Sequence, residues 1–287
     1  MNDPATDFSI AFNERFHINT KELPQKEIPL FRAFHNTLAS LADNFHIEEY
    51  HGGSHQVFFT GNGSFARSQA RCELSDLMII AFSSSDVRLS YLQAKCEKIT
   101  PTSISERIFS ANLEQWFLLS SRPRINGVGT FNPPPGLLSD SILPSVGSFV
   151  FFYKDSKGYQ THYSSASHLE CVRLYTKRYG KVKSNGPCSA TTSSFEECLV
   201  ACDNQSFAES LYRLQIGTPI NPKYPKCNII RNWLAANISG LVEKEKNTDK
   251  KEVARALIDV LKPEKDEIRY GSIGAKKLII LRTDSKR

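Results

Sequence analysis

Residues 72–98 read CELSDLMIIAFSSSDVRLSYLQAKCEK, in which two largely apolar runs flank a short polar segment. The near-continuous apolar run at 74–82 is typical of a strand that is buried on both faces. Residues 87–95 alternate apolar and polar side chains, the pattern of a second strand. With SSSD at 83–86 as the turn, the stretch predicts an antiparallel hairpin in which Phe82 lies opposite Arg88 and Asp76 opposite Ala94.

Polar side chains gather at the open end of this predicted hairpin. Asp76 opens the first strand, and Gln93 and Lys95 close the second. Carboxylate, amide and carbonyl oxygens are ligands that Mg²⁺ accepts. A lysine beside such an ion can position an attacking water and offset phosphate charge. The hairpin therefore predicts a site for metal-assisted chemistry on a phosphate group.

This arrangement resembles the motif of the PD-(D/E)XK, or restriction-endonuclease-like, nuclease superfamily. Asp76 is followed by sixteen residues and then by Gln93-Ala94-Lys95, and predicted helices at 26–44 and 104–120 flank the hairpin. The resemblance covers about residues 26–120 and extends toward a second hairpin at 146–163. It implies that Asp76, Gln93 and the Ala94 carbonyl hold Mg²⁺ or Mn²⁺ and that Lys95 positions the water.

The family's first helix often supplies another acid near the metal, and the resemblance assigns that role to Glu27. Weaker matches for the same role are Glu22, Glu48 and Glu49. Two positions depart from the family's pattern. Ser75 stands where the family name has proline, at a variable position, and Gln93 stands where glutamate is commonest. An amide binds a divalent ion less strongly than a carboxylate does, although some family nucleases carry glutamine there.

The resemblance implies a metal-dependent nuclease that hydrolyses phosphodiester bonds, with DNA favoured over RNA, in restriction or anti-phage defence. A non-catalytic module that binds nucleic acid or protein through a degenerate nuclease-like fold is the alternative. An unrelated mixed α/β interaction protein is a third interpretation. The arginines nearest the motif are expected either to contact nucleic-acid phosphates or to be solvated: Arg67, Arg71, Arg122 and Arg124. A homodimer or a partner subunit is left open.

The expected fold class is α/β, in the sense of a mixed α+β chain with a restriction-endonuclease-like core sheet flanked by helices. That core is expected over residues 1–185, and a mainly helical region for substrate recognition or interaction over 186–287. Further helices are predicted at 165–179, 195–203, 208–216, 229–242 and 250–261. Further strands are predicted at 56–60, 146–155, 159–163 and 276–282, with a tight turn at 61–63 and loops at 121–136 and 181–193.

Composition narrows the class of protein. The chain has 287 residues, of which 40% are hydrophobic, and a formal net charge of +6. That balance supports a real core and is compatible with nucleic acid as a partner. No run approaches the 18 apolar residues of a membrane span, and no signal peptide is recognised, so no membrane contact and a cytoplasmic location are expected.

The cysteines and histidines give weaker indications. Seven cysteines without a short-spaced framework are expected to stay reduced. Four of them could bind zinc, but burial as small apolar side chains is favoured: Cys188, Cys198, Cys202 and Cys227. The histidines at 51, 55, 162 and 168 are scattered and form no nuclease motif. No phosphate-binding P-loop and no G-x-S-x-G motif occurs.

Overall fold

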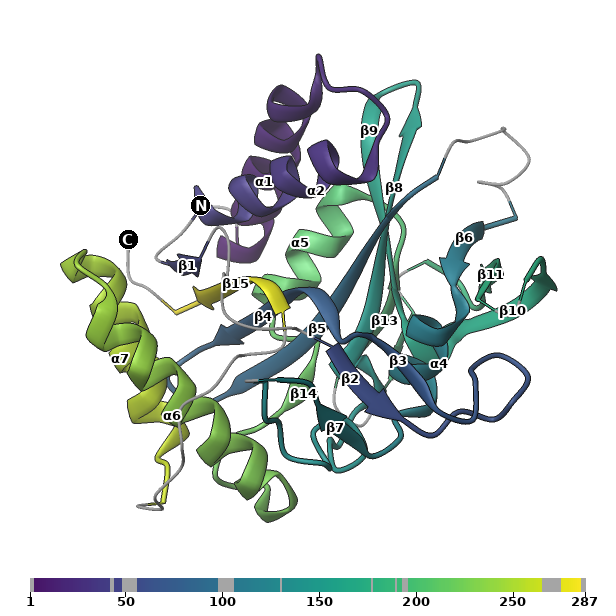
Figure 1. Ribbon diagram of the computed structural model, residues 1–287. Coiled ribbons are helices and arrows are strands. Elements are labelled where there is room, and N and C mark those ends of the chain that lie inside the picture. Colours follow the sequence, from purple (N-terminus) through teal and green to yellow (C-terminus); the bar gives the residue numbers. More distant parts are fainter. Residues whose placement is uncertain are drawn as a thin grey trace.

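A mixed sheet with helices on both of its faces forms the body of the molecule (Figure 1). The computed structural model describes residues 3–41, 44–47, 56–97, 106–129, 131–176, 178–188, 190–192, 196–264 and 275–284. The predicted mixed α+β class with a helix-flanked sheet is confirmed. Within the described residues, no helix is both long enough and apolar enough to cross a lipid bilayer.

The main sheet has nine strands and contains both parallel and antiparallel neighbours. Its order is β1 (Asn44–Ile47), β15 (Ala275–Arg282), β4 (Ser75–Phe82), β5 (Val87–Cys96), β8 (Gly147–Asp155), β9 (Gly158–Ser165), β13 (Glu197–Ala201) and β12 (Ala190–Thr192), and β14 (Thr218–Pro219) also pairs with β5. The pairs β15–β4 and β5–β8 are parallel, and the other pairs are antiparallel. Strands from both predicted regions, 1–185 and 186–287, therefore share one sheet.

Two small sheets lie beside the main one. The first has the order β10 (Leu169–Leu174), β11 (Tyr179–Ser184) and β6 (Ile108–Asn112), and the second has the order β3 (Ala70–Glu73), β2 (Gln56–Phe59) and β7 (Ile125–Gly127). Three short 3₁₀ turns cover Pro144–Val146, Ala166–His168 and Pro225–Cys227.

The helices divide between the two faces of the main sheet (Figure 1). One face packs against α1 (Pro4–Thr20), α2 (Glu27–Ala39) and α5 (Asn204–Tyr212), in a core where the buried rings of Phe12, Phe34 and Phe207 meet. The other face packs against α4 (Leu113–Ser121), α6 (Asn228–Lys244) and α7 (Thr248–Leu261), together with the small sheets. Alternation along β4 sends Met78 to this second core and Leu77 to the first, which is why the whole strand is buried.

The hairpin at 75–96 forms as predicted, but its register differs by one residue. Phe82 pairs with Val87, not with Arg88, because the Ser83 N–H donates to the Asp86 carbonyl at 2.9 Å and closes a four-residue connection. Continuing that register brings Asp76 beside Gln93 instead of Ala94. Asp76, Gln93 and Lys95 consequently lie on the same face of the sheet, the face that carries Met78 and Tyr91.

Several predicted helices are wrong because short apolar runs fit a strand as well as a helix turn. The helix expected over 104–120 begins only at Leu113, where the Asn112 side chain accepts from the Glu114 N–H, and residues 108–112 are β6. The expected capping box at 103–106 lies mostly outside the described residues. The described residues of 165–179 are not a helix either: they include a 3₁₀ turn, strand β10 and the start of β11.

Three more predictions at the level of elements need correction. The helix expected at 195–203 is wrong, since β13 covers 197–201 with every side chain buried in the main sheet. The loop expected at 181–193 contains most of β11 and all of β12. Residues 61–63 do not form a tight hairpin turn, because a longer loop joins β2 to β3.

Other elements agree with prediction within a few residues. They are helices α2, α5, α6 and α7 and strands β2, β8, β9 and β15. Helix α1 was not predicted.

The cysteines depart from the expectation of free thiols. Cys188 and Cys202 form a disulfide that ties the loop before β12 to the end of β13. Neither of these two cysteines is therefore free to bind zinc. Cys198 and Cys227 are buried free thiols, as the favoured interpretation had it. Disulfides are rare in reducing compartments, so this bond runs counter to the expectation of seven reduced cysteines.

Candidate functional site

Three strands bring polar side chains together at the open end of the hairpin, where β4 and β15 begin and β5 ends (Figure 1). The Asp76 side chain is buried there, and both of its oxygens are engaged. The Ala94 N–H donates to Asp76 Oδ2 at 3.0 Å, and the Lys276 ammonium donates to Oδ1 at 3.0 Å. Asp76 therefore links the two hairpin strands to the neighbouring parallel strand.

Lys276 is a site residue that the sequence did not reveal. Its ammonium also donates to Glu73 Oε2 at 2.8 Å, so it lies between two carboxylates. Burial favours the neutral amine, but Asp76 and Glu73 together outweigh it and raise the pKa of Lys276 above its usual range. Lys276 is more than 180 residues from the motif in sequence, and only the parallel register, with Ala275 beside Ser75, brings it to Asp76.

Lys95 and Glu27 form the outer rim of the site. The Lys95 ammonium lies 3.6 Å from Glu27 Oε1, and it donates to the Ala94 carbonyl at 2.9 Å. The Glu27 side chain is 44% exposed, at the first residue of α2. Loss of hydration on its inner side raises the pKa of Glu27; the Lys95 ammonium lowers it, and the nearby Asp76 carboxylate raises it further. The acid predicted from the first helix is thus next to the predicted lysine.

Gln93 sits on the inner side of the site with its amide unsatisfied. The residue is fully buried, and neither Oε1 nor Nε2 has a hydrogen-bond partner within the described part of the chain. Leaving a buried polar group unpaired costs about 1–3 kcal/mol, so such groups are rare in native proteins. A ligand that accepts from Nε2 or binds Oε1 would remove that cost.

The polar face continues past Lys95 into Glu97, which is also buried. The Glu97 carboxylate accepts from the Ser110 N–H at 2.6 Å and pairs with the Lys181 ammonium from β11. Gln25, just before α2, donates to the Glu97 carbonyl at 2.7 Å. These contacts fasten the end of β5 to α2 and to the small sheet, so the backbone that carries Ala94 and Lys95 is held from both sides.

The donors suit a hard divalent ion in kind, but not as a ready-made cage. Within the described ranges, no group of three or more His, Cys, Asp or Glu side chains is placed to hold a metal ion. A metal site here would draw on Asp76 Oδ1, the Ala94 carbonyl and the Gln93 amide oxygen, with Glu27 at the rim. In the structure, the Lys95 ammonium donates to the Ala94 carbonyl, and the Lys276 ammonium donates to Asp76 Oδ1. An ion would therefore replace a cationic side chain, and the unpaired Gln93 amide is the observation in favour of the fit.

The other predicted residues lie away from this group or are already engaged. Arg67 forms an ion pair with the buried Glu114 at 2.6 Å, and Arg122 donates to the carbonyls of Ser141 and Leu143. Arg71 donates to Gln56 and lies over the ring of Phe58. Arg124 is exposed directly before β7, and Glu22 is exposed shortly after α1. Glu48 and Glu49 fall outside the described residues.

His162 is buried against the rings of Phe109 and Phe151, and burial lowers the pKa of its imidazole to about 3. It therefore stays neutral at physiological pH and behaves as a core side chain. His51 and His55 lie outside the described residues.

Comparison with known proteins does not add to this picture. No family model, no curated protein and no solved structure matches the chain.

Proposed function

We propose that this protein is a metal-dependent nuclease with a restriction-endonuclease-like core, and that it hydrolyses phosphodiester bonds at the open end of the β4–β5 hairpin. The observation that carries the proposal is the meeting of Asp76, Gln93, Lys95 and Glu27 at one edge of the sheet. Asp76 is seventeen positions before Gln93 in sequence, yet it bonds directly to the backbone between Gln93 and Lys95.

Each residue has a separate part in the proposed reaction. Asp76, the Ala94 carbonyl and Gln93 would hold Mg²⁺ or Mn²⁺, with Glu27 shaping the outer side. The bound ion would supply charge that polarises the phosphoryl group. Lys95 would hold the attacking water through its ammonium and offset the negative charge that builds on the phosphoryl oxygens. As the water–phosphorus bond forms and the bond to the leaving sugar oxygen breaks, the water would lose a proton to solvent and the leaving oxygen would gain one from solvent.

DNA is the proposed substrate, and restriction or anti-phage defence the proposed role, on the strength of the resemblance alone. A cytoplasmic location belongs to the same proposal. The Cys188–Cys202 disulfide weighs against a permanently reducing surrounding. Counting free thiols in protein isolated under alkylating conditions tests whether this disulfide is present in the cell.

Cleavage of supercoiled plasmid tests the proposed function. Cutting with Mg²⁺ or Mn²⁺, and none in chelator or with Ca²⁺, is the expected result, because the smaller octahedral ions hold water in line for attack. A mobility shift without cutting would favour the non-catalytic nucleic-acid-binding module. Neither cutting nor a shift would favour an unrelated interaction protein.

Gln93→Glu is expected to keep or raise the cleavage rate, since a carboxylate adds charge toward the ion at nearly the same length. Because the residue is fully buried, the new carboxylate is also expected to lower the melting temperature in chelator. Mn²⁺ should restore that melting temperature. Thermal unfolding with and without Mn²⁺ measures the effect. Gln93→Met is the control, because methionine keeps the size of the side chain but has no oxygen to bind the ion. A Glu variant that responds to Mn²⁺ no more than the Met variant does would exclude position 93 as a ligand.

Lys276→Met is expected to tighten Mn²⁺ binding by about tenfold, because it removes an ammonium that competes for Asp76 Oδ1 in a charge-assisted hydrogen bond. Titration calorimetry without nucleic acid measures the affinity. Lys276→Arg keeps the competing cation and serves as the matched control. Equal affinity in the Met and Arg variants would mean that the ion does not bind at Asp76 Oδ1.

A further inference from the structure

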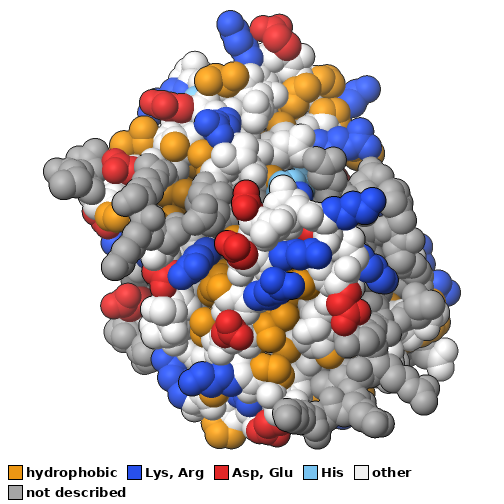
Figure 2. Space-filling model, turned by 90° about the vertical axis from the view of Figure 1, so that its left-hand side faces the viewer, with side chains coloured by type: hydrophobic (Ala, Val, Ile, Leu, Met, Phe, Trp, Pro, Cys, Tyr) orange, Lys and Arg blue, Asp and Glu red, His pale blue; other side chains and the backbone are white. Residues whose placement is uncertain are grey.

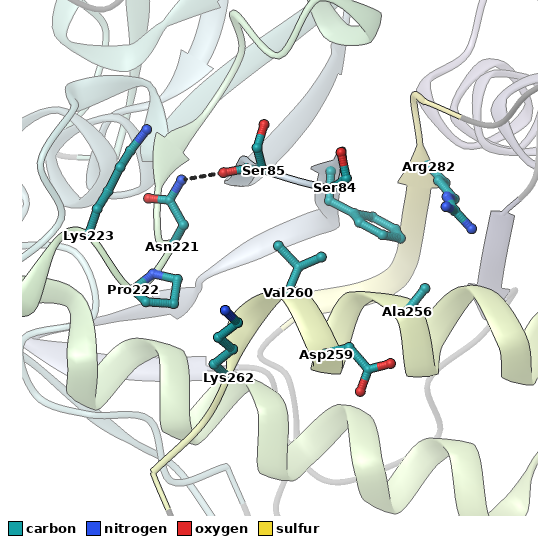
Figure 3. Close-up of a pocket in the computed structure, with 11 residues that line it drawn as sticks. Ser84, Ser85, Asn221, Pro222, Lys223, Ala256, Asp259, Val260, Lys262 and Arg282 are labelled. Atoms are coloured by element: carbon teal, nitrogen blue, oxygen red, sulfur yellow. Dashed lines mark hydrogen bonds between the residues drawn. The ribbon is translucent and has the colours of Figure 1, made fainter.

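A second polar site lies at the other end of the same hairpin (Figure 3). The cleft has a volume of about 470 Å³, within the range of small-molecule sites. Its walls come from the β4–β5 turn, the segment after β14, the end of α7 and the end of β15. One residue that lines the cleft from each of these four segments is, in that order, Ser84, Lys223, Val260 and Arg282. Phe82 and Asp76 are six residues apart along β4, so the cleft is about 20 Å from the candidate nuclease site.

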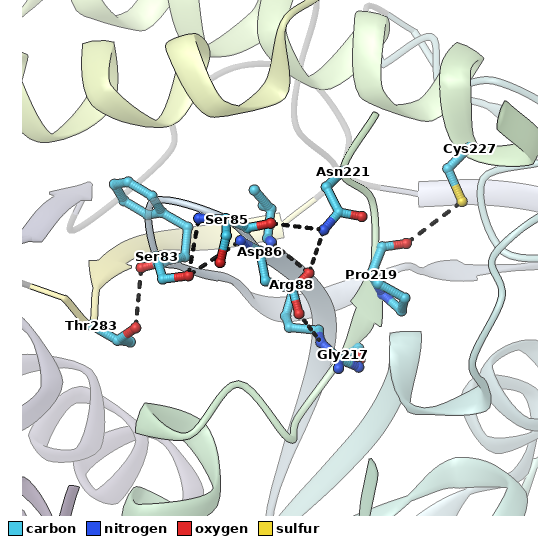
Figure 4. A network of polar contacts seen from close by, with 11 residues as sticks. Ser83, Ser85, Asp86, Arg88, Gly217, Pro219, Asn221, Cys227 and Thr283 are labelled. Atoms are coloured by element: carbon cyan, nitrogen blue, oxygen red, sulfur yellow. Dashed lines mark hydrogen bonds and ion pairs between the residues drawn. The ribbon is translucent and has the colours of Figure 1, made fainter. Parts of the chain in front are cut away.

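The walls of this cleft are held in place before any ligand arrives (Figure 4). The Asn221 side chain donates to the Ser85 carbonyl at 3.3 Å and to Asp86 Oδ1 at 2.6 Å, which fixes the segment after β14 to the turn. The Thr283 N–H donates to the Phe82 carbonyl at 2.9 Å, which fixes the end of β15 to β4. Asp284 bridges Arg282 to the Ser84 N–H. A preformed cleft loses little entropy when a ligand binds.

The charge of the cleft is positive. It is lined by Lys223, Lys262 and Arg282 against a single acid, Asp259. Among the described residues, neither lysine ammonium has an ion-pair partner, whereas Arg282 pairs with Asp284 at 3.1 Å. Figure 3 shows the Lys262 side chain rising toward Pro222, while the Asp259 carboxylate points the other way along α7. In Figure 2, which faces this side of the molecule, Lys and Arg side chains lie beside a hydrophobic strip, with Asp and Glu side chains among them.

The remaining lining is suited to a ring and to a hydrogen-bond donor. Pro222, Ala256 and Val260 give the cleft an apolar floor above Phe82. Asn221 is 2% exposed, and its Oδ1 accepts no hydrogen bond within the described ranges. An amino or hydroxyl group of a ligand would satisfy that oxygen.

We propose that this cleft binds a phosphorylated small molecule of mononucleotide size. Lys262 would bind the phosphate from α7, with the Ser84 and Ser85 hydroxyls as further donors. Lys223 would bind it from the opposite wall by turning its side chain inward, since Figure 3 draws that side chain extending away from Lys262. The apolar floor would pack against the ring. The site is separate from the metal-dependent site and does not depend on it.

Titration calorimetry in chelator tests this proposal with AMP, adenosine and inorganic phosphate as probes. AMP is expected to bind, phosphate to bind more weakly, and adenosine not to bind at millimolar concentrations. Lys223→Met and Lys262→Met are each expected to weaken AMP binding by at least about tenfold, the loss typical of a charge-assisted hydrogen bond. Lys226→Met is the matched control, because Lys226 is an exposed lysine three residues from Lys223 and outside the cleft.

Three results would overturn the proposal. The first is no binding of AMP or phosphate at millimolar concentrations. The second is an equal loss of affinity in Lys223→Met and Lys226→Met, which would mean general charge attraction. The third is displacement of AMP by a 5′-phosphorylated oligodeoxynucleotide of much higher affinity, which would assign the phosphate to a nucleic-acid end. Because every titration contains chelator, these outcomes are distinguishable from failure of the nuclease proposal.

Discussion

Replacing Lys95 with alanine is expected to slow Mg²⁺-dependent plasmid cleavage by about 10²–10³-fold, the usual effect of removing one electrostatic contact to a transition state. The fold should be retained, because the Lys95 ammonium lies at the partly exposed rim and its hydrogen-bond partner is the adjacent Ala94 carbonyl. Initial rates at saturating Mg²⁺, with circular dichroism of the same samples, measure both expectations.

Lys226→Ala controls for general loss of positive charge, because Lys226 is exposed and its neighbour Cys227 contacts Pro219, which pairs with Arg88 near the turn end of β5. Its cleavage rate should equal that of the wild type. A Lys95 variant that loses nucleic-acid affinity but keeps its rate once bound would support the binding-module alternative. A Lys95 variant that cuts at the wild-type rate would remove this residue from the reaction.

The hairpin could be predicted from sequence because every signal for it is local. The apolar run of β4, the alternation of β5 and the serine-rich turn all lie within residues 72–98. Side chains alternate between the two faces of a strand. An error of one residue in the predicted register therefore changes which side chains of the two strands are expected to meet at the site. The turn hydrogen bond between Ser83 and Asp86 sets that register, and no local pattern indicated it.

Lys276 could not be predicted because its place depends on a parallel pairing with β4 across most of the chain. Parallel neighbours are joined by long crossovers, so sequence distance gives no indication of contact. A different cause hid the membership of β13 in the main sheet: its five residues are all buried, and a short apolar run does not distinguish a strand from a helix turn. The disulfide was equally invisible, since the separation of Cys188 and Cys202 indicates no pairing.

The cost of Gln93 is informative about the site. A fully buried amide with no partner among the described residues destabilises the fold, and an apolar side chain of similar size would avoid that cost. Stability alone therefore does not account for glutamine at this position. Residues that lower stability are commonly found where a ligand or a reaction needs them. The unpaired amide and the position of Gln93 beside Asp76 together connect this residue to the proposed ion.

Replacing Asp76 has two separable consequences, and a pair of variants distinguishes them. Asp76→Ala removes the acceptor of the Ala94 N–H and the partner of Lys276, so we expect a loss of about 1–3 kcal/mol in the free energy of unfolding. Asp76→Asn keeps an acceptor for the Ala94 N–H but removes the charge. It should therefore unfold nearer to the wild type.

Both Asp76 variants are expected to lose cleavage and to bind Mn²⁺ at least about 100-fold more weakly, since even residues behind a metal ligand commonly contribute 10–100-fold. Chemical denaturation and calorimetry on the same preparations measure stability and affinity. Loss of activity in Asp76→Asn without loss of stability is the result that ties Asp76 to chemistry. Wild-type cleavage in both variants would mean that the active site lies elsewhere, because the hydrogen bond and the charge would then serve only to join β4, β5 and β15.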